Sequence, residues 1–254
     1  MVRYLLAVVM VVALASSVTA ATSFYDDFEN GVGGDIVYAP WGNAPGNPAS
    51  PNGNNNLVAT ATNEHSVSGN HSARAFASDP AAWNGYVDFG ATASAVSAEV
   101  WLFEDKSNPG TVNPVTNMLA LIGAAPNPTA FTDYLQLGVV SFWPSGSTGY
   151  GYRTPAGMYN ASVSRKAGWT NLAIYADSLA SGGQVRFYID GTLVGTKSRA
   201  SGVSLQYVRI GNNSKSYENF WYDDLRVTVP EPASLLGLLG GCGMFLVGFR
   251  LRRR

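Results

Sequence analysis

Residues 184–196 read Gln-Val-Arg-Phe-Tyr-Ile-Asp-Gly-Thr-Leu-Val-Gly-Thr, and this stretch decides the fold class. Val185, Phe187 and Ile189 alternate with polar or less apolar residues, which is the period-two pattern of a half-buried strand. Asp190-Gly191 follows, a dipeptide that tolerates the positive φ angles of a two-residue hairpin turn. The stretch therefore predicts an antiparallel β-hairpin.

The same alternation recurs along most of the chain. In one segment Val96, Ala98, Val100 and Leu102 share one face, while Ser97, Glu99, Trp101 and Phe103 share the other. Similar runs occupy residues 135–139, 169–177, 203–207 and 225–229. No window of a dozen residues has the apolar spacing of a surface helix. We therefore expect an all-β sandwich of two antiparallel sheets.

The composition fits this fold and excludes several classes of protein. The 254 residues include 41 Gly and Pro and 30 aromatic residues, too many turn formers for a helical bundle and enough aromatics for a core. The 16 basic residues nearly balance the 17 acidic ones, which argues against a nucleic-acid partner. The only cysteine is Cys242, so residues 21–229 contain no thiol for a disulfide or a nucleophile.

The N-terminus has the three parts of a secretory signal peptide. Arg3 precedes the apolar run 5–15, and the small residues of 16–20 follow it. An apolar run of this length is too short to cross a membrane as a helix. We expect the general secretion machinery to export the chain and cleavage to follow Ala20, so that residues 1–20 are a signal peptide.

The C-terminus combines a Pro-Glu-Pro tripeptide, an apolar run at 233–249 and terminal arginines. As a helix the run is about 25 Å long, a short transmembrane helix whose arginine end stays in the cytoplasm. In this order and spacing the three parts resemble the PEP-CTERM sorting signal of bacterial exported proteins, here residues 230–254. The resemblance implies a transient inner-membrane anchor, processing by an exosortase, and delivery to the cell surface or the extracellular matrix. The residues that carry the signal are Pro230, Glu231, Pro232, Arg252, Arg253 and Arg254.

Between the two signals, residues 21–229 form the body of the protein. Three of its segments, 24–29, 169–177 with the hairpin after it, and 222–227, resemble laminin-G-like, concanavalin-A-like domains. The resemblance implies a two-sheet antiparallel jelly-roll sandwich. Most members of this group are binding modules for glycans or proteins, with some catalytic relatives, so it implies binding more strongly than catalysis.

A glycosidase is the alternative that the sequence leaves open. Glu99 and Glu104 frame the segment Glu-Val-Trp-Leu-Phe-Glu, which resembles a strand motif of laminarinase-type jelly rolls, where two Glu flank an Asp. Retaining hydrolysis needs two carboxyl groups about 5 Å apart. Here Trp101 replaces the Asp, and residues five apart on a regular strand point to opposite faces unless a bulge intervenes. We therefore expect a strand with two exposed acids and no enzyme, with an extracellular glycoside hydrolase as the alternative.

Acidic residues gather near both ends of the body, where they could hold a structural calcium ion. Asp27 and Glu29 lie near one end and Asp224 near the other, and jelly-roll binding modules often carry Ca²⁺ where their first and last strands meet. Calcium prefers several carboxylate and carbonyl oxygens. Caps of turns, or side chains exposed to solvent, explain these residues equally well.

Glycine-separated aromatic residues between 143 and 159 predict a binding loop. Aromatic rings stack on the C–H faces of sugars, and we expect these residues to bind an extracellular polysaccharide. The candidates are Trp143, Tyr150, Tyr152 and Tyr159, with Trp41 and Trp83 as further options. The sequence thus predicts a non-catalytic, lectin-like surface or matrix protein, the alternatives being a hydrolase and a structural coat component that binds other proteins.

Overall fold

The fold is described from a computed structural model of the chain. The structure describes residues 20–30, 41–42, 58–59, 65–75, 84–92, 94–105, 116–123, 134–140, 149–179, 182–199, 204–211 and 218–230. Residues 22–228 form one compact unit. Residues 1–21 and 229–254 form a second unit, almost all of which lies outside the described residues.

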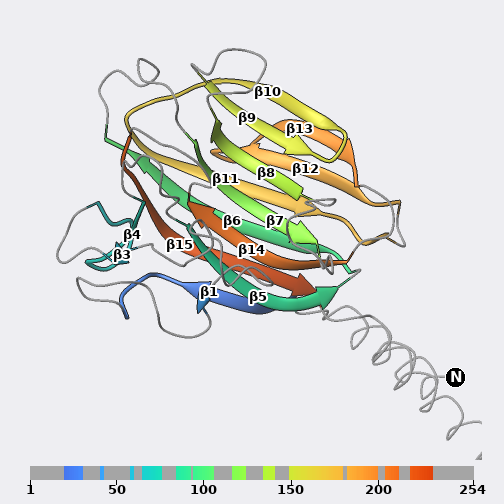
Figure 1. Ribbon diagram of the computed structural model, residues 1–254, viewed down its shortest axis with the longest axis horizontal. Coiled ribbons are helices and arrows are strands. Elements are labelled where there is room, and N and C mark those ends of the chain that lie inside the picture. The colour runs from blue at the N-terminus through green and yellow to red at the C-terminus, as the bar shows by residue number, and fades with distance from the viewer. Residues whose placement is uncertain are drawn as a thin grey trace, which may run out of the picture. The chain divides into compact units, whose positions relative to one another are not determined.

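The described part of the chain consists of strands and their connections and contains no α-helix (Figure 1). This confirms the all-β prediction. The strands are β1 (Ala20–Asp26), β2 (Trp41–Gly42), β3 (Val58–Ala59), β4 (Ala73–Ala75), β5 (Asn84–Thr92), β6 (Val96–Glu104), β7 (Thr116–Gly123), β8 (Tyr134–Val140), β9 (Gly149–Thr154), β10 (Gly157–Ser164), β11 (Gly168–Ala176), β12 (Gln184–Ile189), β13 (Thr192–Ser198), β14 (Leu205–Gly211) and β15 (Phe220–Pro230).

The strands form two antiparallel sheets, which we call sheet A and sheet B. Sheet A has the order β13-β12-β11-β6-β15-β4-β3, and β1 also pairs with β15. Sheet B has the order β10-β9-β8-β7-β14-β5-β2. The hairpin prediction is confirmed, because β12 and β13 are joined by Asp190 and Gly191, with φ angles of 48° and 73°.

The two sheets pack against each other through their inner faces, as a sandwich requires. The ring of Tyr152 on β9 stacks on that of Phe187 on β12, with 4.7 Å between the ring centroids. Tyr222 on β15 donates a hydrogen bond of 2.9 Å to the side-chain oxygen of Asn117 on β7. Buried aliphatic residues fill the rest of the interface, among them Val100, Leu102, Leu172, Ile174 and Val185 from sheet A and Leu119, Leu121, Leu135, Leu137, Val208 and Ile210 from sheet B.

The prediction of a loop through residues 143–159 is wrong for its second half. Residues 149–154 and 157–164 form β9 and β10, which pair with each other as a hairpin. Gly149, Gly151 and Gly157 lie within these strands, where alternating tyrosines can face the core, rather than marking a long irregular loop. Trp143 lies outside the described residues.

Candidate functional site

The candidate site lies on the outer face of sheet A, which is turned away from sheet B. It is built from alternate residues of three neighbouring strands, β6, β11 and β12. Strand pairing aligns Glu99 of β6 with Ala173 of β11, and Ala173 with Tyr188 of β12. Directly paired residues point to the same side of a sheet. The small side chain of Ala173 therefore lies between two larger ones, and the next row brings Tyr175 beside Arg186.

This arrangement leaves an open pocket of about 390 Å³ on the outer face of sheet A. Tyr175 and Tyr188 form one wall, with their ring centroids 5.3 Å apart in an edge-to-face arrangement. Tyr175 is 40% exposed, which is unusual for so large a side chain in the middle of a strand. The residues that line the pocket are Glu99, Asn171, Ala173, Tyr175, Arg186, Tyr188 and Gly191.

Polar groups complete the pocket and are held in place by hydrogen bonds. The amide nitrogen of Asn171 donates to Oε1 of Glu99 at 3.0 Å. Arg186 forms an ion pair of 2.5 Å with Asp177. Burial raises the pKa of Tyr175, with the charge of Glu99 as a further cause, so its phenol remains protonated and able to donate a hydrogen bond at neutral pH.

The pocket therefore combines one exposed and one half-buried aromatic ring with a carboxylate, an amide and a guanidinium. Aromatic faces can stack on the C–H surface of a sugar, and the polar groups can bond its hydroxyls. A carboxylate accepts hydrogen bonds from hydroxyl groups, and a side-chain amide both accepts and donates them. Chemically, the site suits a neutral or weakly charged polar ligand of saccharide size.

The tyrosines that the sequence singled out have ring faces that are already occupied. Tyr150 is 1% exposed and faces the core. Tyr152 is stacked between Phe187 and Tyr159, whose centroids lie 4.7 and 5.2 Å from its own. The other face of Tyr159 carries the amino group of Lys197, 3.8 Å from the ring centroid. None of the three presents a free ring face to a ligand.

The two remaining tryptophan candidates lie elsewhere. Trp41 is 6% exposed, and its indole nitrogen donates to the side-chain oxygen Oδ2 of Asp26 at 2.5 Å. Its ring packs against Phe24 and Phe28, so it belongs to the core. Trp83 lies outside the described residues.

Glu99 and Glu104 point to opposite faces of β6, as the strand geometry predicted. Glu99 lies at the pocket on the outer face, whereas Glu104 is 2% exposed between the sheets. The expectation that both acids are exposed is wrong for Glu104, because the interior supplies it with partners. With the sheet between them, these two carboxyl groups cannot flank one glycosidic bond.

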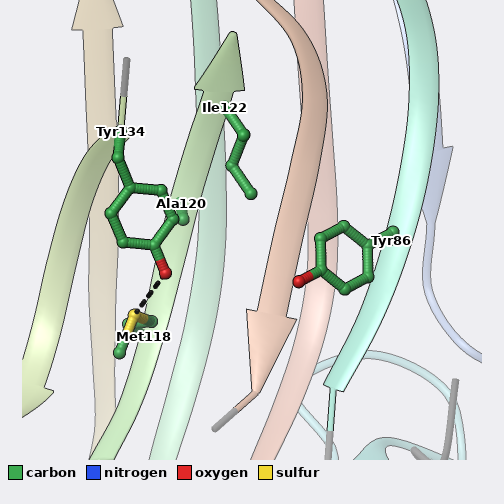
Figure 2. Close-up of a cluster of buried hydrophobic side chains, with 5 residues drawn as sticks. All are labelled: Tyr86, Met118, Ala120, Ile122 and Tyr134. Carbon is green, nitrogen blue, oxygen red and sulfur yellow. Dashed lines mark hydrogen bonds between the residues drawn. The ribbon is translucent and has the colours of Figure 1, made fainter. Parts of the chain in front are cut away.

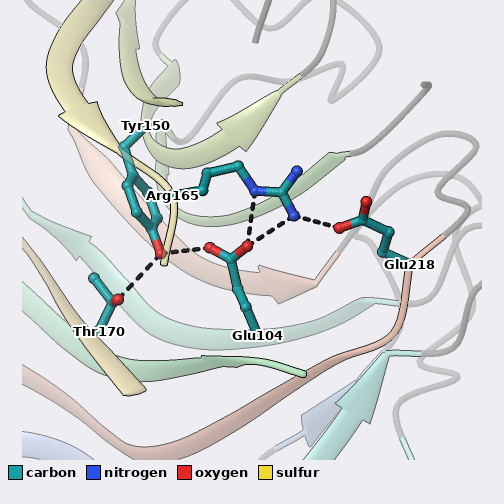
Figure 3. A network of polar contacts seen from close by, with 5 residues as sticks. All are labelled: Glu104, Tyr150, Arg165, Thr170 and Glu218. Atoms are coloured by element: carbon teal, nitrogen blue, oxygen red, sulfur yellow. Dashed lines mark hydrogen bonds and ion pairs between the residues drawn. The ribbon is translucent and has the colours of Figure 1, made fainter. Parts of the chain in front are cut away.

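Glu104 lies in a buried polar network (Figure 3). One carboxylate oxygen accepts a hydrogen bond of 2.5 Å from the hydroxyl of Tyr150, which also contacts Thr170 at 3.1 Å. The other oxygen accepts from Nε of Arg165 at 2.7 Å, and Arg165 is also paired with Glu218. Burial raises the pKa of Glu104, while the charge of Arg165 lowers it.

The predicted calcium ligands are engaged by protein donors. Oε1 of Glu29 accepts backbone N–H groups of residues 70 and 71 at 2.6 and 2.7 Å. Oδ1 of Asp224 accepts the hydroxyl of Tyr25 at 2.6 Å, and Oδ1 of Asp27 accepts the backbone N–H of Glu29 at 3.3 Å. Across the described ranges, no group of three His, Cys, Asp or Glu side chains is arranged to hold a metal ion. The calcium site stays a prediction.

Sequence reasoning did not identify Asn171, Tyr175, Arg186 or Tyr188 as site residues. The signal was present, because the outward positions of segments 169–177 and 184–189 carry aromatic and polar residues in alternation with the core residues. These two segments are β11 and β12, which pair with each other and follow each other in the sequence. Their neighbour β6 is distant in the sequence, so the complete pocket depends on the strand order.

Comparison with known families identifies the C-terminal signal. Residues 228–254 match the PEP-CTERM protein-sorting motif, which confirms the predicted sorting signal. This motif indicates export, membrane anchoring before processing, and processing by an exosortase. No helix within the described residues is long and apolar enough to span a membrane. The predicted membrane helix at 233–249 lies outside these residues, and so does the predicted signal peptide except for Ala20, the first residue of β1.

No curated protein sequence matches the chain. Among solved structures, a sialidase is 10% identical over 83% of this chain, with a TM-score of 0.49, and the match spans only 19% of the sialidase. The carbohydrate recognition domain of Emp47p is 10% identical over 85% of this chain and 99% of its own, with a TM-score of 0.45. Domain 4 of AbnA, an extracellular arabinanase from Geobacillus stearothermophilus solved with arabinotriose, is 16% identical over 87% of this chain and 98% of its own, with a TM-score of 0.46. At TM-scores below 0.5, function has to be argued from the residues of this chain.

Proposed function

We propose that the protein is an exported, non-catalytic carbohydrate-binding protein of the bacterial cell surface or extracellular matrix. In this proposal its body is a laminin-G-like jelly roll, and a saccharide unit of an extracellular polysaccharide binds in the pocket on the outer face of sheet A. The observation that carries the proposal is the wall of exposed Tyr175 and half-buried Tyr188 beside the hydrogen-bonded pair of Glu99 and Asn171. The sorting motif supports it, because an exported protein meets polysaccharides rather than cytoplasmic metabolites.

The pocket is suited to binding a chain rather than enclosing a small molecule. It is open to solvent, and Leu193, 51% exposed near the start of β13, extends the apolar surface beyond Tyr188. An open aromatic surface lets a polymer pass across the sheet, whereas small-molecule sites bury most of the ligand. Aromatic contacts of this kind contribute about 0.5–1.5 kcal/mol each beyond the area that they bury.

Binding of the full-length chain to a glycan array and to gels containing soluble polysaccharides tests the proposal, with the producer's own exopolysaccharide included. We expect saturable binding that Tyr188→Ala weakens about tenfold. Tyr159→Ala is the matched control, because it removes a tyrosine with both ring faces occupied and should leave affinity unchanged.

Three results would overturn the proposal. The first is that no glycan binds, which would favour a coat component that binds other proteins. The second is that Tyr159→Ala weakens binding while Tyr188→Ala does not. The third is release of reducing sugar from a polysaccharide with loss of turnover in Glu99→Gln, which would make the protein a hydrolase.

A further inference from the structure

The outer face of sheet B, which is turned away from sheet A, carries a row of mostly large side chains. Strand pairing aligns one residue from each of six strands across this face, from β5 to β10. The row is Tyr86, Arg209, Ala120, Gln136, Arg153 and Met158. Figure 2 shows Tyr86 and Ala120 of this row together with Met118, Ile122 and Tyr134 of the neighbouring rows.

Arg209 is the second residue of this row and is buried. It is 1% exposed, and no carboxylate of the described residues forms an ion pair with it. One terminal nitrogen donates to the hydroxyl of Tyr86 at 3.2 Å, and its Nε has no hydrogen-bond partner. A buried charge is costly unless it is paired, so the arrangement calls for an anion.

The second observation is that donors converge on a weak acceptor. The other terminal nitrogen of Arg209 points at the sulfur of Met118, 3.2 Å away. The side-chain amide of Gln136 and the hydroxyl of Tyr134 are directed at the same sulfur, the latter at 3.7 Å. A thioether is a poor acceptor, whereas an oxyanion would satisfy the donors of Arg209 and Gln136.

The surroundings add positive charge and aromatic surface. The guanidinium of Arg153 lies over the ring of Tyr134, 5.5 Å from its centroid, and Arg209 lies 5.0 Å from the same centroid. Two cations therefore flank one ring. Met158 and Tyr207 pack against the cluster and are partly exposed, so its rim reaches solvent.

We propose that this cluster is an oxyanion-binding site for an acidic saccharide, with Arg209 as the charged anchor. The oxyanion is a carboxylate, as in a uronate residue, or a sulfate ester. The rings of Tyr86 and Tyr134 hold the guanidinium of Arg209 in place, and Gln136 supplies a neutral donor. The site is separate from the pocket on sheet A, so either site can fail without the other.

Thermal unfolding and titration calorimetry of the full-length chain test this site with defined sugars. The probes are oligogalacturonate, its methyl ester, and a galactan sulfate. We expect the uronate or the sulfate to raise the melting temperature, and the uncharged ester to have no effect. Arg209→Gln should weaken binding about tenfold or more, because it removes a charge-assisted donor. Arg226→Gln is the control, since it removes an exposed arginine that also lies over a tyrosine ring, on sheet A.

If Arg209→Gln does not fold, Gln136→Glu provides a second test of the oxyanion site. This substitution keeps the shape and places a carboxylate among the donors that converge on Met118. We expect a higher melting temperature without ligand and no further response to oligogalacturonate or galactan sulfate. Equal response to acid and ester, equal losses in Arg209→Gln and Arg226→Gln, or a Gln136→Glu protein that is less stable yet still responds would each overturn the proposal.

Discussion

Replacing Arg165 with methionine isolates the buried charge network between the sheets. The arginine side chain is 1% exposed and is paired with both Glu104 and Glu218, whose side chains are 2% and 3% exposed. Methionine fills much of the space of the arginine stem but donates no hydrogen bond. The substitution therefore leaves two carboxyl groups in the interior without their shared cation.

The expected cost follows from the burial of all three groups. Removing one partner of a buried ion pair typically destabilises a protein by about 3–5 kcal/mol, because the remaining charge is uncompensated. Since these side chains are almost completely buried, solvent does not screen the loss. For a body of this size the loss corresponds to a fall of roughly 6–20 °C in the melting temperature.

The cost should also depend on pH, and its sign can be derived. Burial raises the pKa of Glu104 above its usual 4.5, and Arg165 opposes this shift. Without Arg165 the folded-state pKa rises further above the unfolded value. A carboxyl group shifted in this direction binds its proton more tightly in the folded state, so stability falls as pH rises through the interval above 4.5. Arg165→Met should thus be milder in acid than at neutral pH.

Urea unfolding followed by tryptophan fluorescence, at about pH 5 and about pH 7.5, measures both effects. Adding Glu104→Gln to Arg165→Met removes one of the stranded charges and should recover part of the stability at the higher pH. A loss below about 1 kcal/mol, or a loss independent of pH, would refute the reasoning, because it would mean that the pair contributes no more than a surface salt bridge.

Three further predictions address the backbone and the acidic residues. Gly138→Ala should destabilise the protein by several kcal/mol, because a Cβ there would overlap the carbonyl oxygen of Asn117 and lie 2.7 Å from Cα of Met118. Urea unfolding measures this, and an unchanged urea midpoint would contradict it. Burial raises the pKa of Asp223 from 3.8 to about 6, so carbon-detected NMR should show this carboxyl group titrating near that value. The free energy of unfolding should fall by up to about 3 kcal/mol as pH rises from 3.8 to about 6, and titration of Asp223 below pH 4 would exclude the shift. If calcium is bound at the body's ends, adding it should raise the melting temperature and Asp224→Ala should abolish that response, whereas an identical response in both proteins would exclude Asp224 as a ligand.

The sequence predicted the fold class because the signals for strands are local. Alternation in 96–103 and the Asp190-Gly191 turn depend only on neighbouring residues, and the structure has β6 and the β12–β13 hairpin at these positions. The sorting motif was equally readable, since its three parts are contiguous. Pairing between distant strands, such as β6 with β11 and β15, has no comparable local signal.

The positions of the tyrosine rings in segment 150–159 could not be predicted from neighbouring residues alone. Glycines between aromatic residues are typical of loops, but Gly149, Gly151 and Gly157 are strand residues, and the room for a tyrosine ring comes from a glycine of another strand. At Gly195 of β13, a Cβ would lie 2.7 Å from a ring carbon of Tyr152, so the absence of a side chain makes room for that ring. The contact joins the two sheets, and only the packed structure reveals it.

The outer faces of sheets A and B differ in their burial, which the alternation pattern alone does not predict. This difference determines which side chains each face can carry. Strands β6 and β12 alternate buried and partly or fully exposed residues, whereas the described residues of β7 and β8 are buried on both faces. A sheet face in contact with solvent can carry Tyr175 and Arg186 at little cost, and such a face suits the hydroxyls of a neutral sugar. On a buried face a guanidinium such as that of Arg209 is costly unless an anion compensates it. A neutral saccharide bound at the proposed site on sheet A and an acidic one bound at the proposed site on sheet B would occupy separate sites, so neither should displace the other.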